Sequence, residues 1–555
     1  MPNETLFPTD SPQAIRQPKT DRLVLERLLH EATLDANLDE SLIESAHEVL
    51  VKWADLESSG RLKKLKETQM QGDFLAEVLG EALGYAKAVD GAESWQYEQH
   101  YTIAGQTPDA VLGHFRPAEE KELLGVVELK GPTVHLDRDR SGGRTAIDQC
   151  WDYLVNTPLE CRWGLVSNIV SFRLYERNST KRAYEHFTLQ SLRDLPTFKR
   201  FYVLFHRQGL IDRWMIGPPR TVKLLEESRS RQREVGDKLY DAYSTQRLLL
   251  IEHLHRELGH SLDEAVEMAQ RLFDRVIFIA FCEDRGLLPR KTLNSAYERL
   301  PAFSAVTNPR WQNYKTLFKF VNEGGPSSSD EKNGRIHAYN GGLFAPSPAD
   351  DLELDDRWTT FFNTIGKYDF ADEVNLDVLG HLFERSITEL EKLKESGLFG
   401  GNQEKIEEYA QMPQSAKRKR LGIYYTPPEL TSRIVQYTLD ELIDERFAAE
   451  AVKYGIDEVD ARRGVAPDDP AFWQACLDIL RNLKIVDPAC GSGAFLFQAY
   501  NSLELRYAEV IGHLETGRSG SRLTQTAADA ESTDSSGESP MMFGTMVACR
   551  VRVVG

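Results

Sequence analysis

The spacing of apolar and polar residues changes along the chain and predicts different kinds of structure in successive stretches. From about residue 19 to residue 88, apolar side chains recur with the period of amphipathic helices, as in residues 74–83. Strand-like runs follow at 97–104, 110–112, 123–129 and 163–175, with a helical stretch at 146–154 between the last two. This mixture of strands and helices within about 200 residues predicts one compact α/β domain.

Beyond about residue 220 the pattern becomes charged and helical, as at 238–258, 261–281 and 376–393, with loop signals at 324–329 and 340–344. A third region begins near Lys417. Its apolar run 483–486 predicts a buried strand, and the serine-rich, aperiodic tail beyond Gly512 predicts disorder. The predicted domains are a disordered arm (1–18), an α/β domain (19–215), a helical connector (216–415), the start of a second α/β domain (416–512) and a disordered or aberrant tail (513–555).

Composition and charge bear on the partners and the cellular compartment that we expect for this protein. The formal net charge of −19 argues mildly against a protein coated in nucleic acid, although binding depends on local patches such as the basic runs 229–233 and 417–420. The six cysteines are scattered without metal-ligand spacing, as unpaired thiols are in a reducing cytosol. We find neither a long uninterrupted apolar segment nor a secretory signal, and so expect a cytoplasmic protein with no membrane partner.

Two carboxylates and a lysine form the first candidate site. Glu128 and Lys130 lie on one face of a predicted strand, because side chains alternate along a strand. Asp109 precedes Glu128 by nineteen residues and opens another apolar run, so the two carboxylates could meet on adjacent strands as hard oxygen ligands for Mg²⁺. Lys130 could position or help deprotonate a water that attacks a phosphodiester. A Glu-x-Lys triplet alone is common, and an exposed strand face with an ion pair would also explain it.

In company with its neighbours the triplet resembles the PD-(D/E)XK nuclease fold, in the branch that carries a QxxxY motif. Pro108 precedes Asp109, and Gln149 and Tyr153 have the QxxxY spacing on the following predicted helix. The resemblance implies that Asp109 and Glu128 bind the metal and that Gln149 and Tyr153 have structural or DNA-orienting roles. It makes Lys130 the catalytic lysine.

The same resemblance implies an acidic metal ligand on the helix before these strands. Glu81 is the residue we assign to this role. Glu77 lies one helical turn away and could serve equally.

The string Asp-Pro-Ala-Cys-Gly-Ser-Gly at residues 487–493 is the most specific motif of the chain. It lies between the predicted strand 483–486 and the helical run 494–500, where its glycines would let a ligand approach backbone N–H groups. The absence of a GK[ST] element excludes a P-loop. The spacing also lacks the third glycine and the acidic ribose-binding residue of a dinucleotide site.

This string resembles motif I of S-adenosylmethionine-dependent DNA adenine-N6 methyltransferases, and Tyr-Tyr-Thr-Pro at 424–427 resembles their motif X. The resemblance implies a partial Rossmann-like domain that binds S-adenosylmethionine. The cofactor-binding residues that it implies are Tyr425, Thr426, Pro427, Asp487, Pro488, Ala489, Cys490, Gly491 and Gly493.

That family also needs an [N/D]PP[Y/F] loop that grips the flipped-out adenine, and these 555 residues contain none. We therefore expect a truncated or frame-shifted product without methyl transfer. Over about residues 60–505 the chain resembles the N-terminal portion of type IIG-like fused restriction–modification enzymes. This implies a phage-defence protein with double-stranded DNA as its partner, S-adenosylmethionine and Mg²⁺ as cofactors, and a separate chain as one source of the missing half. The alternatives are a protein that acts only as an Mg²⁺-dependent nuclease and a non-catalytic remnant that binds DNA or a partner.

Overall fold

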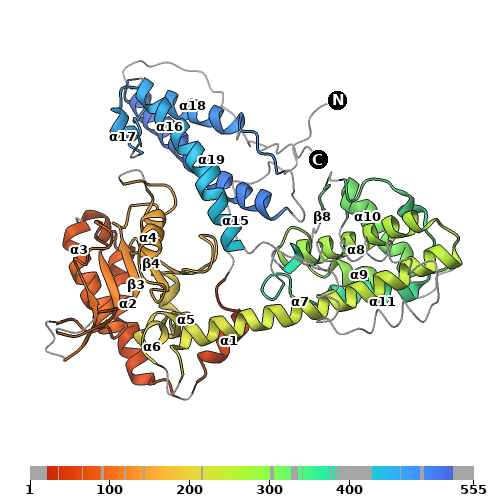
Figure 1. Ribbon diagram of the computed structural model, residues 1–555, viewed down its shortest axis with the longest axis horizontal. Coiled ribbons are helices and arrows are strands. Elements are labelled where there is room, and N and C mark those ends of the chain that lie inside the picture. Colours follow the sequence, from red (N-terminus) through yellow and green to blue (C-terminus); the bar gives the residue numbers. More distant parts are fainter. Residues whose placement is uncertain are drawn as a thin grey trace. The chain divides into compact units, whose positions relative to one another are not determined.

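A computed structural model describes most of the chain (Figure 1). The described residues are 22–487 and 493–528, except 36, 66, 89–92, 118–120, 142–143, 214–216, 301–305, 327–334, 340–341, 375–377, 381, 383–385, 387–427 and 463. They form two compact units. One comprises the described residues of 16–228 and 426–555, and the other those of 229–425.

A six-stranded mixed sheet forms the centre of the first unit. Its strands are β1 (Trp95–Glu98), β2 (Ala110–Phe115), β3 (Glu122–Leu129), β4 (Trp163–Ser167), β5 (Ser171–Glu176) and β6 (Tyr184–Thr188), paired in that order. Every pair is antiparallel except β3 and β4, which are joined through helix α4 (Ala146–Val155). A parallel pair needs such a crossover because the chain must return to the same end of the sheet. The α/β class predicted from the sequence is confirmed.

Helices cover both faces of this sheet. Side chains alternate along β3. Val127 lies on one face of the sheet, in a core shared with helices that precede and follow the strands in sequence. Val126 lies on the other face, in a core shared with α4. The helices that contribute to the first core include α1 (Glu26–Ala32), α2 (Glu40–Ser58), α3 (Glu67–Phe74), the π-helical segment η2 (Leu75–Ala82), α5 (Leu195–Phe205), α6 (Arg207–Leu210) and the start of α7 (Arg220–Glu252). Glu128 therefore faces α4, whose Thr145 N-cap and Asp148 form a capping box that fixes where the helix begins.

Several strands begin or end at residues other than those predicted from the sequence. The run 163–175 is a hairpin of β4 and β5 with a turn at Ile169 in a left-handed conformation (φ 72°), so the alternating pattern spans two strands. The strand expected at 97–104 is β1 at Trp95–Glu98 instead. Strand β6 and helix α5 follow the predicted runs and were not anticipated. Periodicity marks apolar faces, whereas the ends of strands depend on which neighbour supplies hydrogen bonds.

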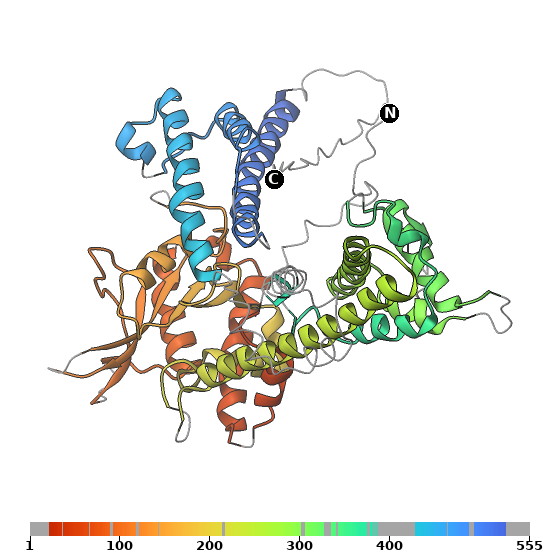
Figure 2. The same cartoon turned by 45° about the vertical axis from the view of Figure 1, so that its right-hand side comes forward.

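The second unit is helical, as predicted, apart from one short pair of strands. It contains the described part of α7 (Arg220–Glu252) after Ser228, the π-helical η5 (His253–Glu257), α8 (Leu262–Asp284), α9 (Thr292–Glu298), α10 (Pro309–Glu323), α11 (Thr359–Ile365), and β7 (Gly325–Pro326) paired with β8 (Arg335–Ile336). These helices, yellow-green to green in Figure 2, share one apolar core. Most of the predicted helix 376–393 and all of the basic run 417–420 lie outside the described residues.

The C-terminal part of the first unit is a helical bundle. Its elements are α15 (Pro428–Val435), the π-helical η9 (Gln436–Asp440), α16 (Glu441–Lys453), α17 (Glu458–Arg462), α18 (Pro470–Arg481) and α19 (Ala494–Ala528). The prediction of a buried strand at 483–486 is wrong: the segment is an irregular link with Val486 68% exposed, since no strand is described within 428–528 to pair with it. Helix α19 extends to Ala528, into the tail 513–555 that the sequence predicted to be disordered or aberrant, and residues 529–555 lie outside the described residues. Among the described helices, none is long and apolar enough to cross a membrane.

Candidate active site

The register of β2 and β3 brings two carboxylates together at one end of the sheet. Ala110 pairs with Val127, so Asp109, just before β2, lies opposite Glu128 near the end of β3. The backbone N–H of Leu129 donates to Asp109 Oδ2 at 2.6 Å, which fixes that side chain against the end of β3. The structure therefore places Asp109 and Glu128 side by side, as the sequence predicted.

Lys130 and two residues of α4 complete the cluster. The Lys130 Nζ donates to Glu128 Oε1 and, at 3.0 Å, to Gln149 Oε1. The Gln149 amide is itself oriented by the loop before α4, because its Nε2 donates to the carbonyl oxygens of Ser141 at 3.1 Å and Arg144 at 3.3 Å. This pairing leaves Gln149 Oε1 facing the lysine.

Tyr153 lies one helical turn after Gln149 on α4 and is also turned toward the carboxylates. Its hydroxyl lies close enough to the Glu128 carboxylate to lower the pKa of that group. Burial, followed by the charge of Glu128, raises the pKa of Tyr153 well above its ordinary value, so the phenol stays protonated and can donate. The two residues of the QxxxY spacing thus contact the catalytic candidates from one helix face.

The helix acid predicted from the sequence is not placed in this cluster. Glu77 faces α2, where its carboxylate accepts from Lys52 Nζ at 2.7 Å and Trp53 Nε1 at 2.9 Å. Glu81 is exposed on η2, and the structure gives it no contact with Asp109 or Glu128. Instead Gln71 of α3 donates from Nε2 to Asp109 Oδ1. Sequence reasoning missed Gln71, because a glutamine on a polar helix face carries no pattern that distinguishes it from a surface residue.

The electrostatics of the cluster come from the buried Glu128 carboxylate, the half-buried Asp109 carboxylate and one lysine. Burial, and then the charge of Asp109, raises the pKa of Glu128 to about 7, while Lys130 opposes the shift. Burial likewise raises the pKa of Asp109, against the hydrogen bond from the Leu129 N–H. A divalent cation would stabilise the ionised forms of both carboxylates, because it would relieve the repulsion between them.

The donor set fits Mg²⁺. Asp109 and Glu128 supply hard oxygen ligands, and Mg²⁺ usually takes only one or two carboxylates from a protein, with water and substrate phosphate completing its shell. Over the described ranges, no group of three or more histidine, cysteine, aspartate or glutamate side chains is arranged to hold a metal by itself. An ion bound here would take Asp109 and Glu128 as its carboxylate ligands.

The predicted cofactor residues are only partly described. Tyr425, Thr426, Pro427 and residues 488–492, which include Pro488, Ala489, Cys490 and Gly491, lie outside the described residues. Asp487 ends the irregular link after α18, and Gly493 directly precedes α19 with φ +82°, a left-handed conformation that favours glycine. The Phe497 N–H donates to Gly493 O at 2.8 Å, so this glycine begins the first turn of α19. These two flanks fit a glycine turn that leads into a helix.

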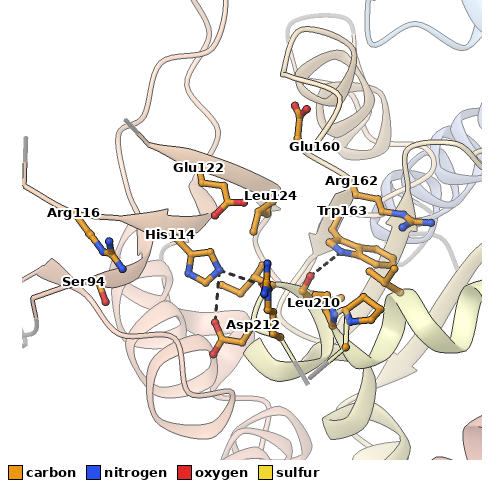
Figure 3. A pocket seen from close by; sticks show the side chains of 16 residues that line it. Ser94, His114, Arg116, Glu122, Leu124, Glu160, Arg162, Trp163, Leu210 and Asp212 are labelled. Atoms are coloured by element: carbon orange, nitrogen blue, oxygen red, sulfur yellow. Dashed lines mark hydrogen bonds and ion pairs between the residues drawn. The ribbon is translucent and has the colours of Figure 1, made fainter. Parts of the chain in front are cut away.

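A cavity of about 1000 Å³ lies at the other end of the sheet (Figure 3). His114 Nε2 lies 3.3 Å from Ile211 O and 3.9 Å from Asp212 Oδ1, and the buried Trp163 donates to Leu210 O at 3.0 Å. None of the five clustered residues lines this cavity. It contains both arginines and carboxylates, and is separate from the candidate active site.

Comparisons with known proteins give a partial likeness. No protein-family model matches the chain. A protein of Methanocaldococcus jannaschii, named as a predicted type II restriction enzyme and methyltransferase RM.MjaORFECS2P, is 28% identical over 266 residues, which cover 43% of this chain and 20% of the relative. The chain thus matches about a fifth of that relative's length. A cryo-electron-microscopy structure of a DrdV–DNA complex aligns over 86% of this chain and 38% of that chain, with 13% identity and a TM-score of 0.20.

Proposed function

We propose that this chain is a DNA restriction–modification protein whose α/β part is an Mg²⁺-dependent endonuclease of the PD-(D/E)XK type. The observation that carries the proposal is the juxtaposition of the half-buried Asp109 and the buried Glu128, with Lys130 hydrogen-bonded to Glu128. The named relative, a predicted restriction enzyme and methyltransferase, supports the same class of function. Double-stranded DNA would be the substrate.

Each residue of the cluster has a distinct part in this proposal. Asp109 and Glu128 would hold Mg²⁺, which when bound neutralises charge on the scissile phosphate. Lys130 would orient the attacking water beside the phosphodiester, and Gln149 would keep the lysine in place through its Oε1 at 3.0 Å. Tyr153, whose phenol stays protonated beside Glu128, would donate to that carboxylate and help to orient it.

We further propose that the region from about residue 416 to 512 binds S-adenosylmethionine in the manner of adenine-N6 DNA methyltransferases. Support comes from the motif string at 487–493 and from the left-handed Gly493 at the start of α19. The backbone N–H groups before α19 would receive the cofactor's carboxylate. The proposal for this region concerns cofactor binding.

Cleavage of duplex DNA in the presence of Mg²⁺ tests the nuclease proposal. Lys130→Ala should lower the cleavage rate by about 100-fold or more, as expected when a group that positions or activates water is lost. Lys121→Ala is a matched control: this lysine lies at the opposite end of β3 and pairs with Glu98. Equal cleavage by wild type and Lys130→Ala would show that the site is wrongly assigned. Duplex binding without any cleavage would favour the non-catalytic alternative.

A further inference from the structure

Resting on the proposed nuclease function, we infer that Gln71 of α3 is the residue that positions the metal-binding carboxylate Asp109, in the place where the sequence suggested a glutamate ligand. Its Nε2 donates to Asp109 Oδ1, while the Leu129 N–H donates to Oδ2 at 2.6 Å. The two oxygens of Asp109 are therefore held from two different elements, a helix and a strand.

Asp109 needs such support because of where it lies. It precedes β2 in a bend, outside the ladder of hydrogen bonds that fixes Ala110 against Val127. A carboxylate at this position can rotate about its side-chain torsions unless its oxygens are engaged. The Leu129 N–H fixes one oxygen, and Gln71 fixes the plane of the group by engaging the other. Partners of this kind orient metal ligands, and their loss typically weakens metal binding or activity.

An amide suits this position better than an acid. The cluster already contains two carboxylates and one lysine. A third carboxylate beside Asp109 would add a repulsive charge and could not donate a hydrogen bond, whereas glutamine donates without charge. The nearby acid Glu77 is turned away from Asp109 toward Lys52, so among the described side chains of α3 and η2 it is Gln71 that hydrogen-bonds to Asp109.

Binding of Mn²⁺ to the full chain without DNA, measured by calorimetry, tests this role independently of catalysis. Gln71→Leu keeps the bulk of the side chain and removes the donor. We expect it to weaken Mn²⁺ binding by about 10-fold to 100-fold and to lower Mg²⁺-dependent cleavage in parallel. Asp73→Ala, an exposed change on the same helix, is the matched control and should leave both quantities unchanged.

Thermal unfolding in EDTA separates positioning from packing. If Gln71→Leu lowers the melting temperature but binds Mn²⁺ as tightly as wild type, the residue is structural and the inference is wrong. If the variant folds normally and binds Mn²⁺ more weakly, the inference holds. If wild type itself fails to bind Mn²⁺ or to cleave DNA, the proposed nuclease function is wrong. If wild type and Gln71→Leu bind Mn²⁺ equally, only the inference about Gln71 is wrong.

Discussion

The metal-free protein should lose stability as the pH rises from about 4.5 to about 7, because its folded state keeps a proton on Glu128 over that range. Burial and the neighbouring charge of Asp109 raise the Glu128 pKa from 4.5 to about 7. Between these values the folded chain binds more protons than the unfolded chain, so the free energy of unfolding falls with rising pH. The stability is fully present below the lower value and is lost by the upper one.

The size of the effect follows from the same shift. A tenfold change in proton affinity corresponds to about 1.4 kcal/mol, so the change to about 7 amounts to about 3 kcal/mol. Glu128 is only 3% exposed, which leaves little solvent to screen the interaction. The raised pKa of Asp109 acts in the same direction and begins at lower pH.

Urea unfolding of the full chain in EDTA, from about pH 5 to about pH 8.5, measures this dependence. Amide hydrogen exchange in β3 reports the unfolding of the sheet separately from the helical unit. Glu128→Gln should flatten the profile, and saturating Mg²⁺ should do the same in wild type, because a bound cation favours both ionised carboxylates. If wild type and Glu128→Gln have the same slope over this range, burial of Glu128 and the charge of Asp109 do not raise the Glu128 pKa as argued.

Three further predictions follow from packing, from a buried ion pair and from the cofactor turn. Gly164→Ala should lower the free energy of unfolding by about 1–3 kcal/mol in urea titrations, because the added Cβ would lie 2.6 Å from Cys150 Sγ. Gly72→Ala is the control and should cause no such loss, because a Cβ at Gly72 would have no neighbouring atom within 4 Å. Arg173→Met should lower the free energy of unfolding by roughly 3 kcal/mol in the same measurement, since Arg173 is 5% exposed and donates to both carboxylate oxygens of Asp137 at 2.6 and 2.7 Å. An unchanged free energy of unfolding would contradict this pairing. Gly493→Val should weaken retention of labelled S-adenosylmethionine in filter binding, because φ +82° strains a β-branched residue; equal retention would place the cofactor elsewhere.

Local patterns predicted the parts of the site that lie close together along the chain. Alternation in β3 placed Glu128 beside Lys130, and the QxxxY spacing placed Gln149 and Tyr153 on one face of α4. The pairing of Asp109 with Glu128 required only that two neighbouring runs form adjacent strands, which β2 and β3 do. These outcomes depend on backbone periodicity, which a sequence records directly.

The same patterns failed where the structure of a segment depends on a hydrogen-bonding partner from another element. The run 483–486 has the composition of a strand, yet it remains irregular because backbone groups form a strand only beside another strand, and none is described within 428–528.

The sequence by itself determined the α/β class, the helical connector, and the identity of two carboxylates, a lysine and two α4 residues as a chemical group. Only the tertiary structure decided which side chain of the N-terminal helices reaches Asp109. It turned Glu77 toward Lys52 and Trp53, left Glu81 exposed, and brought Gln71 to the carboxylate. The physical reason is that a helix offers several polar residues within two turns, and only the packing of α2, α3 and η2 against the sheet selects the one that meets the strand.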